Sequence, residues 1–533
     1  MPILRRNFLV TVGLSAALAV PFSARSASPH INVGLFPGLD QVALAPNGMT
    51  QALAELPAIV QNIIDRSQVP GVAVAVVHNG DTVFAQGFGV RQLGKPEPVT
   101  PETVFLIASL SKSLTGALIA TQVSAGKVQW HDPVVKYLPG FRLANTYVSQ
   151  TATIGDFMAH RSGLPSAAGD DLEDLGYSRE QILSRLHLLP LDDFRTSYHY
   201  ANFGTTTAAE AVATAVGKPW ESLIQAALFD PLDMASSSAR HQDFMRRQNR
   251  AAQHAFEDGR FQALYDRNAD AQSPAGGVSS NVLDMANWMK FMLASGRYKG
   301  RQLATAEALL QATQPQAFSG PMATAESRPG FYGYGFNVGI EPNGRVLVSH
   351  SGAFLLGTGT HYRLLPSANV GIVVLTNGSP VGVAESIAAE FTDRVQYGKP
   401  LRDWFSAYQP LFQGLLEPVG DLVGQLPPAT VRPAGDPTGY VGTYHNEYYG
   451  PATITARGPS LYLALGPGGL NAELKPWDGD TFAIAPVSEN EAKGSLSSVQ
   501  FERMPGSKVA QGFVVEYLNG NGLGQWQRTS AAH

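Results

Sequence analysis

A serine and a lysine stand three residues apart in the tetrapeptide Ser-Leu-Ser-Lys at residues 109–112. A serine hydroxyl is a poor nucleophile until a nearby base takes its proton. On a helix, a lysine three positions later lies one turn above the serine and on the same face. The spacing therefore predicts that Ser109 is a nucleophile and that Lys112 is the base that activates it.

The segments on either side of this tetrapeptide predict how it is positioned. Residues 103–108 form a short apolar stretch, and after Ser109 leucines recur at helical spacing. The serine would thus begin a helix, where free backbone N–H groups and the positive end of the helix dipole gather. Such a position can stabilise an oxyanion and help to keep Lys112 neutral.

A second copy of the pattern, Ser124 with Lys127, shows how unspecific the spacing is by itself. Gly126 lies between the two and is expected to end the helix, so that Lys127 is not held over Ser124. We therefore interpret the second copy as a helix exit. For the first copy the structural alternative is a serine N-cap followed by a solvent-facing lysine, and only the rest of the chain distinguishes the two.

Two further polar elements follow in a fixed order. Tyr200 and Asn202 form a Tyr-x-Asn pattern that begins 91 residues after the serine, and the tripeptide His-Ser-Gly at 350–352 begins 150 residues after Tyr200. Tyr-x-Asn also occurs at 444–446 and 517–519, but both copies lie in a separate C-terminal segment. Only the first copies follow the order Ser-x-x-Lys, Tyr-x-Asn, then a short polar element before a strand.

In this order the elements resemble those of the serine β-lactamase and penicillin-recognising enzyme family. The similarity is greatest to its class C branch, with D,D-peptidases, D-aminopeptidases and esterases. Further segments that resemble the family extend the similarity over residues 45–395; they are residues 69–77, 160–165, 275–280, 284–289, 332–336 and 371–377. The resemblance implies an α/β (α+β) fold in which helices flank an antiparallel sheet and an all-helical lobe holds the region of Tyr200.

The resemblance also implies roles for the motif residues. Ser109 would attack a carbonyl carbon and form an acyl-enzyme, which water later releases. Lys112 and Tyr200 would share the proton, and Tyr200, with a usual pKa of about 10, would need the Lys112 ammonium to hold phenolate character. Asn202 would donate to the amide carbonyl of the substrate or steady Lys112. Backbone N–H groups of Ser109 and Ala353 would form the oxyanion hole.

The third element departs from the pattern of many β-lactamases, which carry a lysine where this chain has His350. A lysine is a fixed charge suited to a substrate carboxylate, whereas histidine is mostly neutral at about pH 7. The histidine therefore favours a peptidase or an esterase over an efficient β-lactamase. Ser351 can still donate its hydroxyl to a substrate, and Gly352 belongs to the same substrate-binding group. The structural alternative for His350 is a strand residue with an internal hydrogen bond.

The N-terminal sequence predicts export. Arg5 and Arg6 precede an apolar stretch that is too short to span a membrane, and small residues allow cleavage after Ser26. The paired arginines resemble a twin-arginine signal, and an ordinary export signal is the alternative. No other stretch reaches the length of a membrane span. A bacterial periplasmic or secreted location is therefore expected.

Composition excludes several other classes of protein. The 533 residues carry a net charge of −5, or −8 without the three arginines of residues 1–26, which argues against nucleic acid as a partner. Cysteine is absent, which excludes disulfides and thiolate chemistry, and the 12 histidines lack zinc-site spacing. No glycine-rich phosphate loop follows a strand. We therefore predict no cofactor and no metal, and a small-molecule or peptide substrate; the oligomeric state stays open.

The chain is expected to divide into an export signal (1–26), a catalytic domain (40–400), a helical and proline-rich linker (401–437) and a C-terminal domain (438–533). Four prolines between residues 427 and 437 are typical of a stiff linker. Beyond them, short alternating segments separated by Gly, Pro and Asp predict a small antiparallel barrel or sandwich. It resembles the lipocalin-like module of family members.

The sequence is compatible with several classes of substrate. A peptidase or amidase for small or unusual peptides, including those with D-residues, is the first hypothesis for this secreted serine hydrolase. A carboxylesterase and a β-lactamase are the alternatives within the same chemistry, since one fold serves amides, esters and lactams. A protein that binds penicillin without turnover, or a scaffold, is the alternative outside it. The scaffold hypothesis is disfavoured because all four motif residues are present; they are Ser109, Lys112, Tyr200 and Asn202.

Overall fold

The computed structural model describes residues 31–32, 36–320, 322 and 324–529, so that the predicted export signal at 1–26 lies outside the described residues. Residues up to Ala43 form a small unit of their own. In that unit β1 (Ile31–Asn32) pairs antiparallel with β2 (Gln41–Val42), and η1 (Pro37–Leu39) lies between them in the chain. All other elements belong to the second unit, which begins at Leu44.

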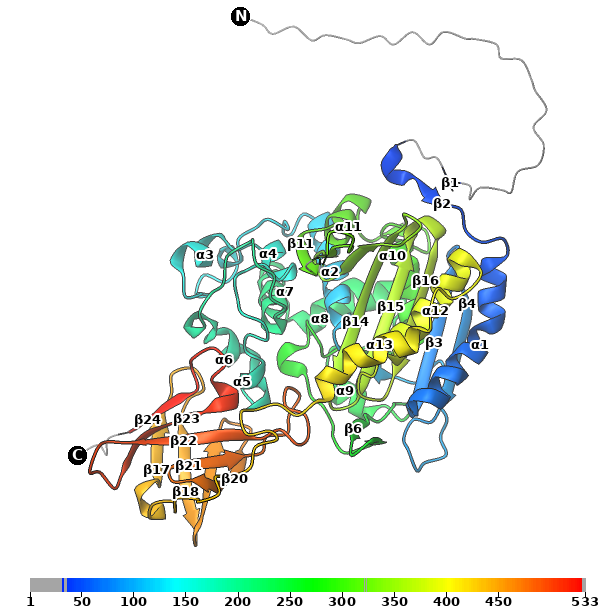
Figure 1. Ribbon diagram of the computed structural model, residues 1–533. Helices are drawn as coiled ribbons and strands as arrows, with labels where there is room; N and C mark the ends of the chain where they lie inside the picture. Colours follow the sequence, from blue (N-terminus) through cyan, green and yellow to red (C-terminus); the bar gives the residue numbers. More distant parts are fainter. Residues whose placement is uncertain (1–30, 33–35, 321, 323, 530–533) are drawn as a thin grey trace, which may run out of the picture. The chain divides into compact units, whose positions relative to one another are not determined.

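An eight-stranded antiparallel sheet forms the centre of the second unit (Figure 1). In spatial order its strands are β11 (Ala317–Gly320), β12 (Gly330–Tyr332), β13 (Asn337–Ile340), β14 (Val346–Phe354), β15 (Thr358–Leu365), β16 (Val370–Thr376), β3 (Gly71–His78) and β4 (Asp81–Gly89). The N-terminal hairpin therefore completes a sheet whose other six strands come from the second half of the domain. This connection brings the start and the end of the domain together.

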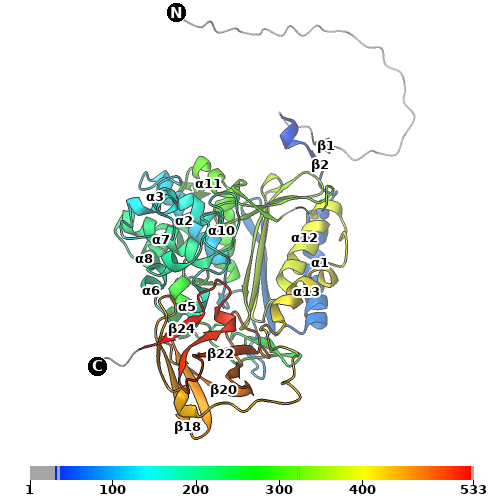
Figure 2. The same ribbon diagram turned by 60° about the vertical axis from the view of Figure 1, so that its left-hand side comes forward.

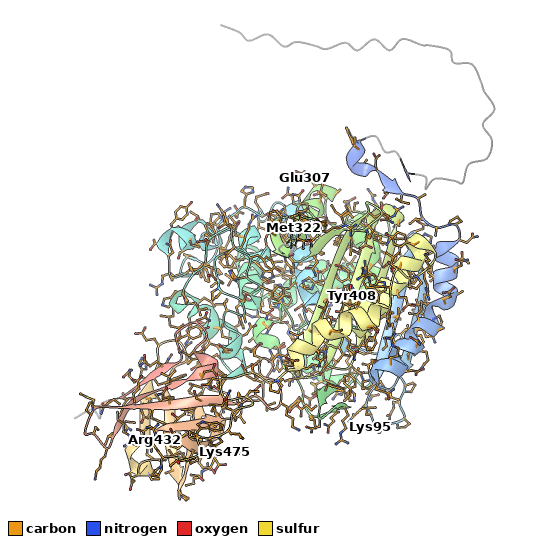
Figure 3. All side chains as sticks on the ribbon, in the orientation of Figure 1. Lys95, Glu307, Met322, Tyr408, Arg432 and Lys475 are labelled. Carbon is orange, nitrogen blue, oxygen red and sulfur yellow. The ribbon has the colours of Figure 1, made fainter. Side chains whose placement is uncertain are left out.

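Helices cover both faces of this sheet, as Figure 2 shows from the side. One face carries α1 (Gly48–Ser67), α12 (Val383–Tyr397) and α13 (Trp404–Gln413), and the other carries α2 (Leu110–Ser124) and α10 (Val282–Leu293). Strand β3 explains why both faces need a cover, because its alternate side chains point to opposite faces and both sets are apolar. Val72, Val74 and Val76 belong to one core, and Ala73, Ala75 and Val77 belong to the other. A strand buried on both faces is apolar throughout. Figure 3 draws the side chains of these layers, and its label Tyr408 marks helix α13.

A lobe of short helices lies beside the sheet and carries the Tyr-x-Asn element. Its elements are η2 (Val134–Lys136), α3 (Thr146–Thr151), α4 (Ile154–Met158), α5 (Asp170–Asp174), α6 (Arg179–Leu183), η3 (Leu186–Leu188), α7 (Asn202–Val216), α8 (Trp220–Ile224), η4 (Gln225–Phe229), η5 (Asp230–Leu232), α9 (His241–Arg246) and α11 (Ala306–Thr313). The same part of the chain forms three further pairs of short antiparallel strands; they are β5 (Phe105–Leu106) with β8 (Ser279–Ser280), β6 (Ala255–Glu257) with β7 (Arg260–Gln262), and β9 (Arg297–Tyr298) with β10 (Arg301–Gln302).

The C-terminal residues form a closed antiparallel barrel, in which the first strand pairs with the last. Its strands are β17 (Gly442–His445), β18 (Ala452–Arg457), β19 (Ser460–Leu465), β20 (Leu470–Asp478), β21 (Thr481–Ile484), β22 (Ser497–Arg503), β23 (Ala510–Val515) and β24 (Gln525–Arg528). Tyr440 and Tyr444 are buried in its core against Phe501. Together with the sheet and the lobe, the barrel confirms the predicted fold class.

The barrel docks on the lobe through backbone contact and shared hydrogen bonds. The Tyr177 hydroxyl donates to the Tyr449 carbonyl at 2.6 Å, and the Tyr449 hydroxyl lies 3.1 Å from Asp171 Oδ2 at the start of α5. Gly176 has a φ of +88°, and a Cβ built there would lie 2.5 Å from Gly468 Cα of the barrel. A side chain at position 176 therefore has no room. The apolar cores of the barrel and the lobe are continuous across this contact.

We predict that Gly176→Ala lowers the free energy of unfolding by about 3 kcal/mol, because it adds both backbone strain and a steric clash with the barrel. The matched control is Gly217→Ala, since Gly217 has a similar φ of +74° but nothing within 4 Å of its added Cβ. The control should lose only about 1 kcal/mol. Thermal and urea unfolding measure both values; equal losses in the two variants would show that the backbones do not meet as described.

Candidate active site

Ser109 lies at the N-terminus of α2, directly after a residue with unusual backbone geometry. Ala108 has a φ of +47°, in the left-handed region that non-glycine residues rarely adopt. The chain then turns, and Ser109 takes the N-cap position of the helix with φ −65° and ψ −5°. Ser109 is half-buried, and its side chain does not cap the helix. Its hydroxyl is therefore not committed to the N–H groups of the helix start.

Lys112 is completely buried one turn further along the helix. Its Nζ lies 3.1 Å from Ser109 Oγ, 2.6 Å from Asn202 Oδ1 and 2.9 Å from the Ala275 carbonyl. These contacts occupy the three donor positions of an ammonium without any carboxylate among them. Burial lowers the pKa of Lys112 to about 7, outweighing the charges of Asp170 and Glu173, which raise it. The lysine can thus be neutral at physiological pH and accept the serine proton.

Tyr200 lies beside this pair, with the Lys112 Nζ 4.5 Å from the centre of its ring. Burial raises the pKa of Tyr200 far above its ordinary value, and an interaction with the Ser109 side chain only partly opposes this effect. The expectation that the lysine ammonium holds Tyr200 as a phenolate therefore differs from the structure. The two pKa shifts favour a neutral phenol and a lysine that loses its proton first.

Asn202, the first residue of α7, connects the lysine to a buried carboxyl group. Its Oδ1 accepts from Lys112, and its Nδ2 donates to Asp170 Oδ2 at 2.9 Å. This arrangement fixes the orientation of the Asn202 amide, because each end has a partner of only one type. Of the two roles expected for Asn202, the structure therefore shows contact with the lysine. Asp170, on α5, had no place in any sequence motif.

His350 lies on β14 with both ring nitrogens engaged. Its Nε2 lies 2.7 Å from the Tyr332 hydroxyl, and its Nδ1 lies 2.6 Å from the Ser351 carbonyl. A carbonyl can only accept, so Nδ1 carries the proton and Nε2 accepts from the tyrosine. Burial lowers the pKa of His350 to about 3, which makes the ring neutral. The Ser351 hydroxyl lies 2.9 Å from His361 Nδ1, so that it too has a protein partner.

Gly352 explains how β14 approaches the start of α2 so closely. A Cβ built at this position would collide with Thr360 Oγ1 and the Ile107 carbonyl and would lie 3.0 Å from the Ser109 amide nitrogen. The strand and the helix start are therefore in backbone contact, and Ala353, the next residue, lines the same cavity as Ser109. The use of the Ser109 and Ala353 N–H groups as an oxyanion hole stays a prediction.

A cavity of about 640 Å³ opens onto the nucleophile. Sheet, lobe, linker and barrel all contribute to its wall, including a barrel loop between β21 and β22. The lining residues are Ser109, Asp170, Tyr198, Tyr200, Asn202, Arg267, Gln272, Asn337, His350, Ser351, Ala353, Phe354, Leu355, Pro380, Gly414, Leu415, Glu417, Val419, Glu489 and Asn490. Lys112 and Gly352 are not among the lining residues. Sequence reasoning gave no role to Asp170, Arg267 or Glu489, which belong to no recurring pattern.

Comparisons with known proteins identify the family of the chain. A family model described as Beta-lactamase matches residues 56–395, and a second, described as Domain of unknown function (DUF3471), matches residues 426–514. The chain therefore belongs to the beta-lactamase family, whose members are mostly serine hydrolases. The resemblance found in the sequence is thus confirmed.

Individual relatives are distant. The chain is 27% identical over 410 residues to unguisins hydrolase ungD′ of Aspergillus campestris (74% of this chain and 75% of the relative). It is 29% identical over 395 residues to penicillin-binding protein 4 of Amycolatopsis lactamdurans (71% of this chain and 94% of the relative). The solved octameric penicillin-binding protein homologue from Pyrococcus abyssi superposes with a TM-score of 0.55 at 20% identity, covering 87% of this chain and 98% of that one. At that identity it shows the fold alone.

No helix among the described residues is both long and apolar enough to cross a membrane. Nor do three or more histidine, aspartate or glutamate side chains of these residues gather in a way that could hold a metal ion.

We predict that Gly352→Ala lowers kcat/KM for p-nitrophenyl butyrate by about 100-fold or more, because an added methyl group pushes β14 away from the Ser109 amide. The matched control is Gly339→Ala on β13, where an added Cβ meets nothing within 4 Å. Initial rates at equal concentrations of folded protein, checked by circular dichroism, compare the two variants. Retained activity in Gly352→Ala would contradict the close approach of strand and helix.

Proposed function

We propose that the protein is a serine hydrolase that forms an acyl-enzyme on Ser109, and that it acts as a peptidase or amidase on small or unusual peptides. The observation that carries the proposal is the 3.1 Å contact between Ser109 Oγ and a fully buried Lys112 whose other partners are uncharged oxygens. A buried lysine of this kind gives up its proton near neutral pH. It is therefore a suitable general base for a serine.

Acylation would begin when neutral Lys112 takes the proton of Ser109. The serine oxygen then attacks the carbonyl carbon, and the N–H groups of Ser109 and Ala353 stabilise the negative charge on the carbonyl oxygen. As the C–N bond breaks, Tyr200 gives its phenol proton to the departing nitrogen and receives one from Lys112. The products of this step are an ester on Ser109 and a free amine.

Deacylation would use the same groups in reverse. Tyr200 and Lys112 take a proton from water, and the resulting hydroxide equivalent attacks the ester carbon. The Ser109–carbonyl bond breaks, Ser109 regains its proton from Lys112, and a carboxylic acid leaves. Asn202 holds Lys112 in place throughout, since its own amide is fixed by Asp170.

The walls of the cavity support a peptide-sized substrate. About 640 Å³ accommodates a small peptide, and Asn337, Gln272 and Asn490 line the space with groups that can bond to amides. The neutral ring of His350 supplies no fixed cation for a lactam carboxylate, which disfavours an efficient β-lactamase. The name of the fungal relative, unguisins hydrolase, supports hydrolysis in general.

A carboxylesterase is the second candidate. Phe354, Leu355, Leu415 and Val419 form an apolar part of the cavity wall that suits a short acyl chain. The two candidates differ in the group that leaves, and the ratio of anilide to ester turnover distinguishes them. We further propose, from the N-terminal sequence, that the protein acts in the periplasm or outside the cell.

Ser109→Ala is expected to abolish turnover of p-nitrophenyl butyrate, because among the described residues the Ser109 hydroxyl is the one that hydrogen-bonds with Lys112. The matched control is Ser124→Ala in the second Ser-x-x-Lys copy, where α2 ends and Gly126 adopts a φ of +67°. It should keep full activity. Intact-protein mass spectrometry after exposure to a fluorescent penicillin gives a second readout, an adduct that Ser109→Ala cannot form. Full turnover by Ser109→Ala would contradict the acyl-enzyme proposal.

The pH dependence of kcat/KM should report Lys112. The pKa of this lysine is lowered to about 7, so the base is protonated and inactive below that pH and becomes active above it. We expect kcat/KM to rise about tenfold per pH unit below pH 7 and to level off above it. Lys112→Arg should be inactive at every pH, since a guanidinium does not lose its proton, whereas Lys127→Arg should keep the profile. A flat profile between pH 5 and 9 would exclude a titrating lysine base.

A further inference from the structure

Ser111 is a serine inside the Ser-Leu-Ser-Lys tetrapeptide, and the proton transfers proposed for Ser109 make no use of it. Its side chain is completely buried. The hydroxyl donates to the Ala108 carbonyl at 2.7 Å and accepts from the Val278 N–H at 3.1 Å. Because a carbonyl only accepts and an amide N–H only donates, both roles of this hydroxyl are fixed. Ser111 therefore connects the start of α2 to the segment that leads into β8.

The Ser111 hydroxyl acts where strand pairing ends. β5 pairs antiparallel with β8, and one further hydrogen bond runs from the Ile107 N–H to the Val278 carbonyl. The next residue, Ala108, turns the chain away with its φ of +47°. The Val278 N–H is buried, and its acceptor is the Ser111 hydroxyl instead of a strand carbonyl. A buried N–H that loses its acceptor is costly, so this contact stabilises the junction of the two segments.

The Ala108 carbonyl and the Ser109 N–H belong to one peptide unit. That unit is planar and trans, so its C=O and its N–H point in opposite directions. A donor that holds the carbonyl oxygen therefore also sets the direction of the Ser109 N–H. Ser111 supplies two such donors, its hydroxyl at 2.7 Å and its own N–H at 3.0 Å. The Ser109 N–H is one of the two groups proposed for the oxyanion hole.

The turn at Ala108 needs this support. A left-handed φ is unfavourable for a residue with a Cβ, and it persists only where the surrounding structure holds it. The side chain of Ala108 packs in a small apolar cluster. Before the turn, the Ile107 carbonyl accepts from the Thr360 hydroxyl at 2.9 Å. Side-chain hydroxyls thus hold the carbonyl before the turn and, through Ser111, the carbonyl of the turn itself.

We propose that Ser111 is a positioning residue: by holding the Ala108 carbonyl it aims the Ser109 N–H at the carbonyl oxygen of the substrate. The inference rests on the proposed serine hydrolase function. Ser111 is not among the residues that line the cavity, so it acts through the peptide unit that precedes the nucleophile. The same hydroxyl holds the segment before β8, where the Ala275 carbonyl accepts from Lys112 at 2.9 Å. One side chain thus positions both the oxyanion donor and an acceptor of the base.

Ser111→Ala should lower kcat/KM for p-nitrophenyl butyrate by about 30-fold, because the Ser109 N–H is no longer held in the direction that stabilises the oxyanion. The loss is smaller than that for a deleted oxyanion donor, since the backbone N–H at 111 still contacts the Ala108 carbonyl. Ser111→Cys, which keeps the volume but is only a weak donor, should show a loss of the same order. Initial rates are compared at equal concentrations of folded protein, checked by circular dichroism. Losses below about threefold in both variants would overturn the proposal.

A second substitution separates a held turn from a general loss of packing. Glycine adopts a left-handed φ without strain, so Ala108→Gly removes much of the need for the Ser111 contact. In that background Ser111→Ala should cost about fivefold or less, compared with about 30-fold in the wild type. The four proteins form a double-mutant cycle. Additive losses would overturn the proposal, because the two residues would then act independently.

Ser113→Ala is the matched control, because Ser113 is a completely buried serine on the same helix whose hydroxyl also has two partners. These partners are the Gly335 carbonyl and the Tyr362 hydroxyl, each at 2.7 Å, and both lie outside the turn and the segment before β8. The variant should lose stability to a similar degree, measured by thermal unfolding, and keep kcat/KM within about threefold. An equal loss of activity in Ser111→Ala and Ser113→Ala would show a general effect of α2 and overturn the specific role.

Hydrogen exchange tests the contact without any turnover. The Ser111 hydroxyl protects the Val278 N–H, so Ser111→Ala should speed exchange of this amide, in a peptide covering residues 275–280, by about tenfold, and Ser113→Ala should not. Unchanged exchange in Ser111→Ala would overturn the positioning role. The proposed function fails separately: wild-type protein without Ser109-dependent ester turnover rejects the hydrolase, while exchange at residue 278 still decides whether Ser111 holds the turn.

Discussion

Burial of the Lys112 amino group without a carboxylate partner is the constraint on which the rest of this structure depends. An ammonium removed from water is costly unless hydrogen bonds or opposite charges replace the lost solvation. Here three uncharged oxygens supply the hydrogen bonds, and they come from the helix start, the lobe and a loop beside the sheet. Because no carboxylate touches the group, its proton is weakly held. A carboxylate partner at the same place would hold Lys112 in its protonated form, and a protonated lysine cannot act as a base.

This constraint explains why the domain needs both a sheet and a lobe. The sheet holds β14 against the Ser109 amide through Gly352, while the lobe brings Tyr200 and Asn202 to the other side of the same lysine. Around them, His350 and Tyr332 satisfy one another as neutral groups. The polar groups next to the nucleophile are thus kept neutral, and the strongly charged groups are placed further along the cavity, at the contact with the barrel.

Local spacing made part of the site predictable. Ser109 and Lys112 are one helical turn apart, and the positive φ of Gly126 fits the predicted helix exit after Ser124. The fold class followed from the order of the motifs and the alternation of the C-terminal strands. Asp170 and Glu489 could not be predicted in this way, because they meet the site only through tertiary contacts. The sequence also could not predict that the pKa of Lys112 falls while the pKa of Tyr200 rises. Burial causes both shifts, and burial depends on the folded structure.

The loop between β21 and β22 completes the wall of the cavity late in the synthesis of the chain. Glu489 and Asn490 are made 380 residues after the nucleophile, and the strands that hold their loop are closed only when β24 pairs with β17. A chain stopped after the catalytic domain would have its nucleophile and base but an open cavity. The cavity therefore takes its finished form only in a molecule whose barrel has been synthesised and has closed.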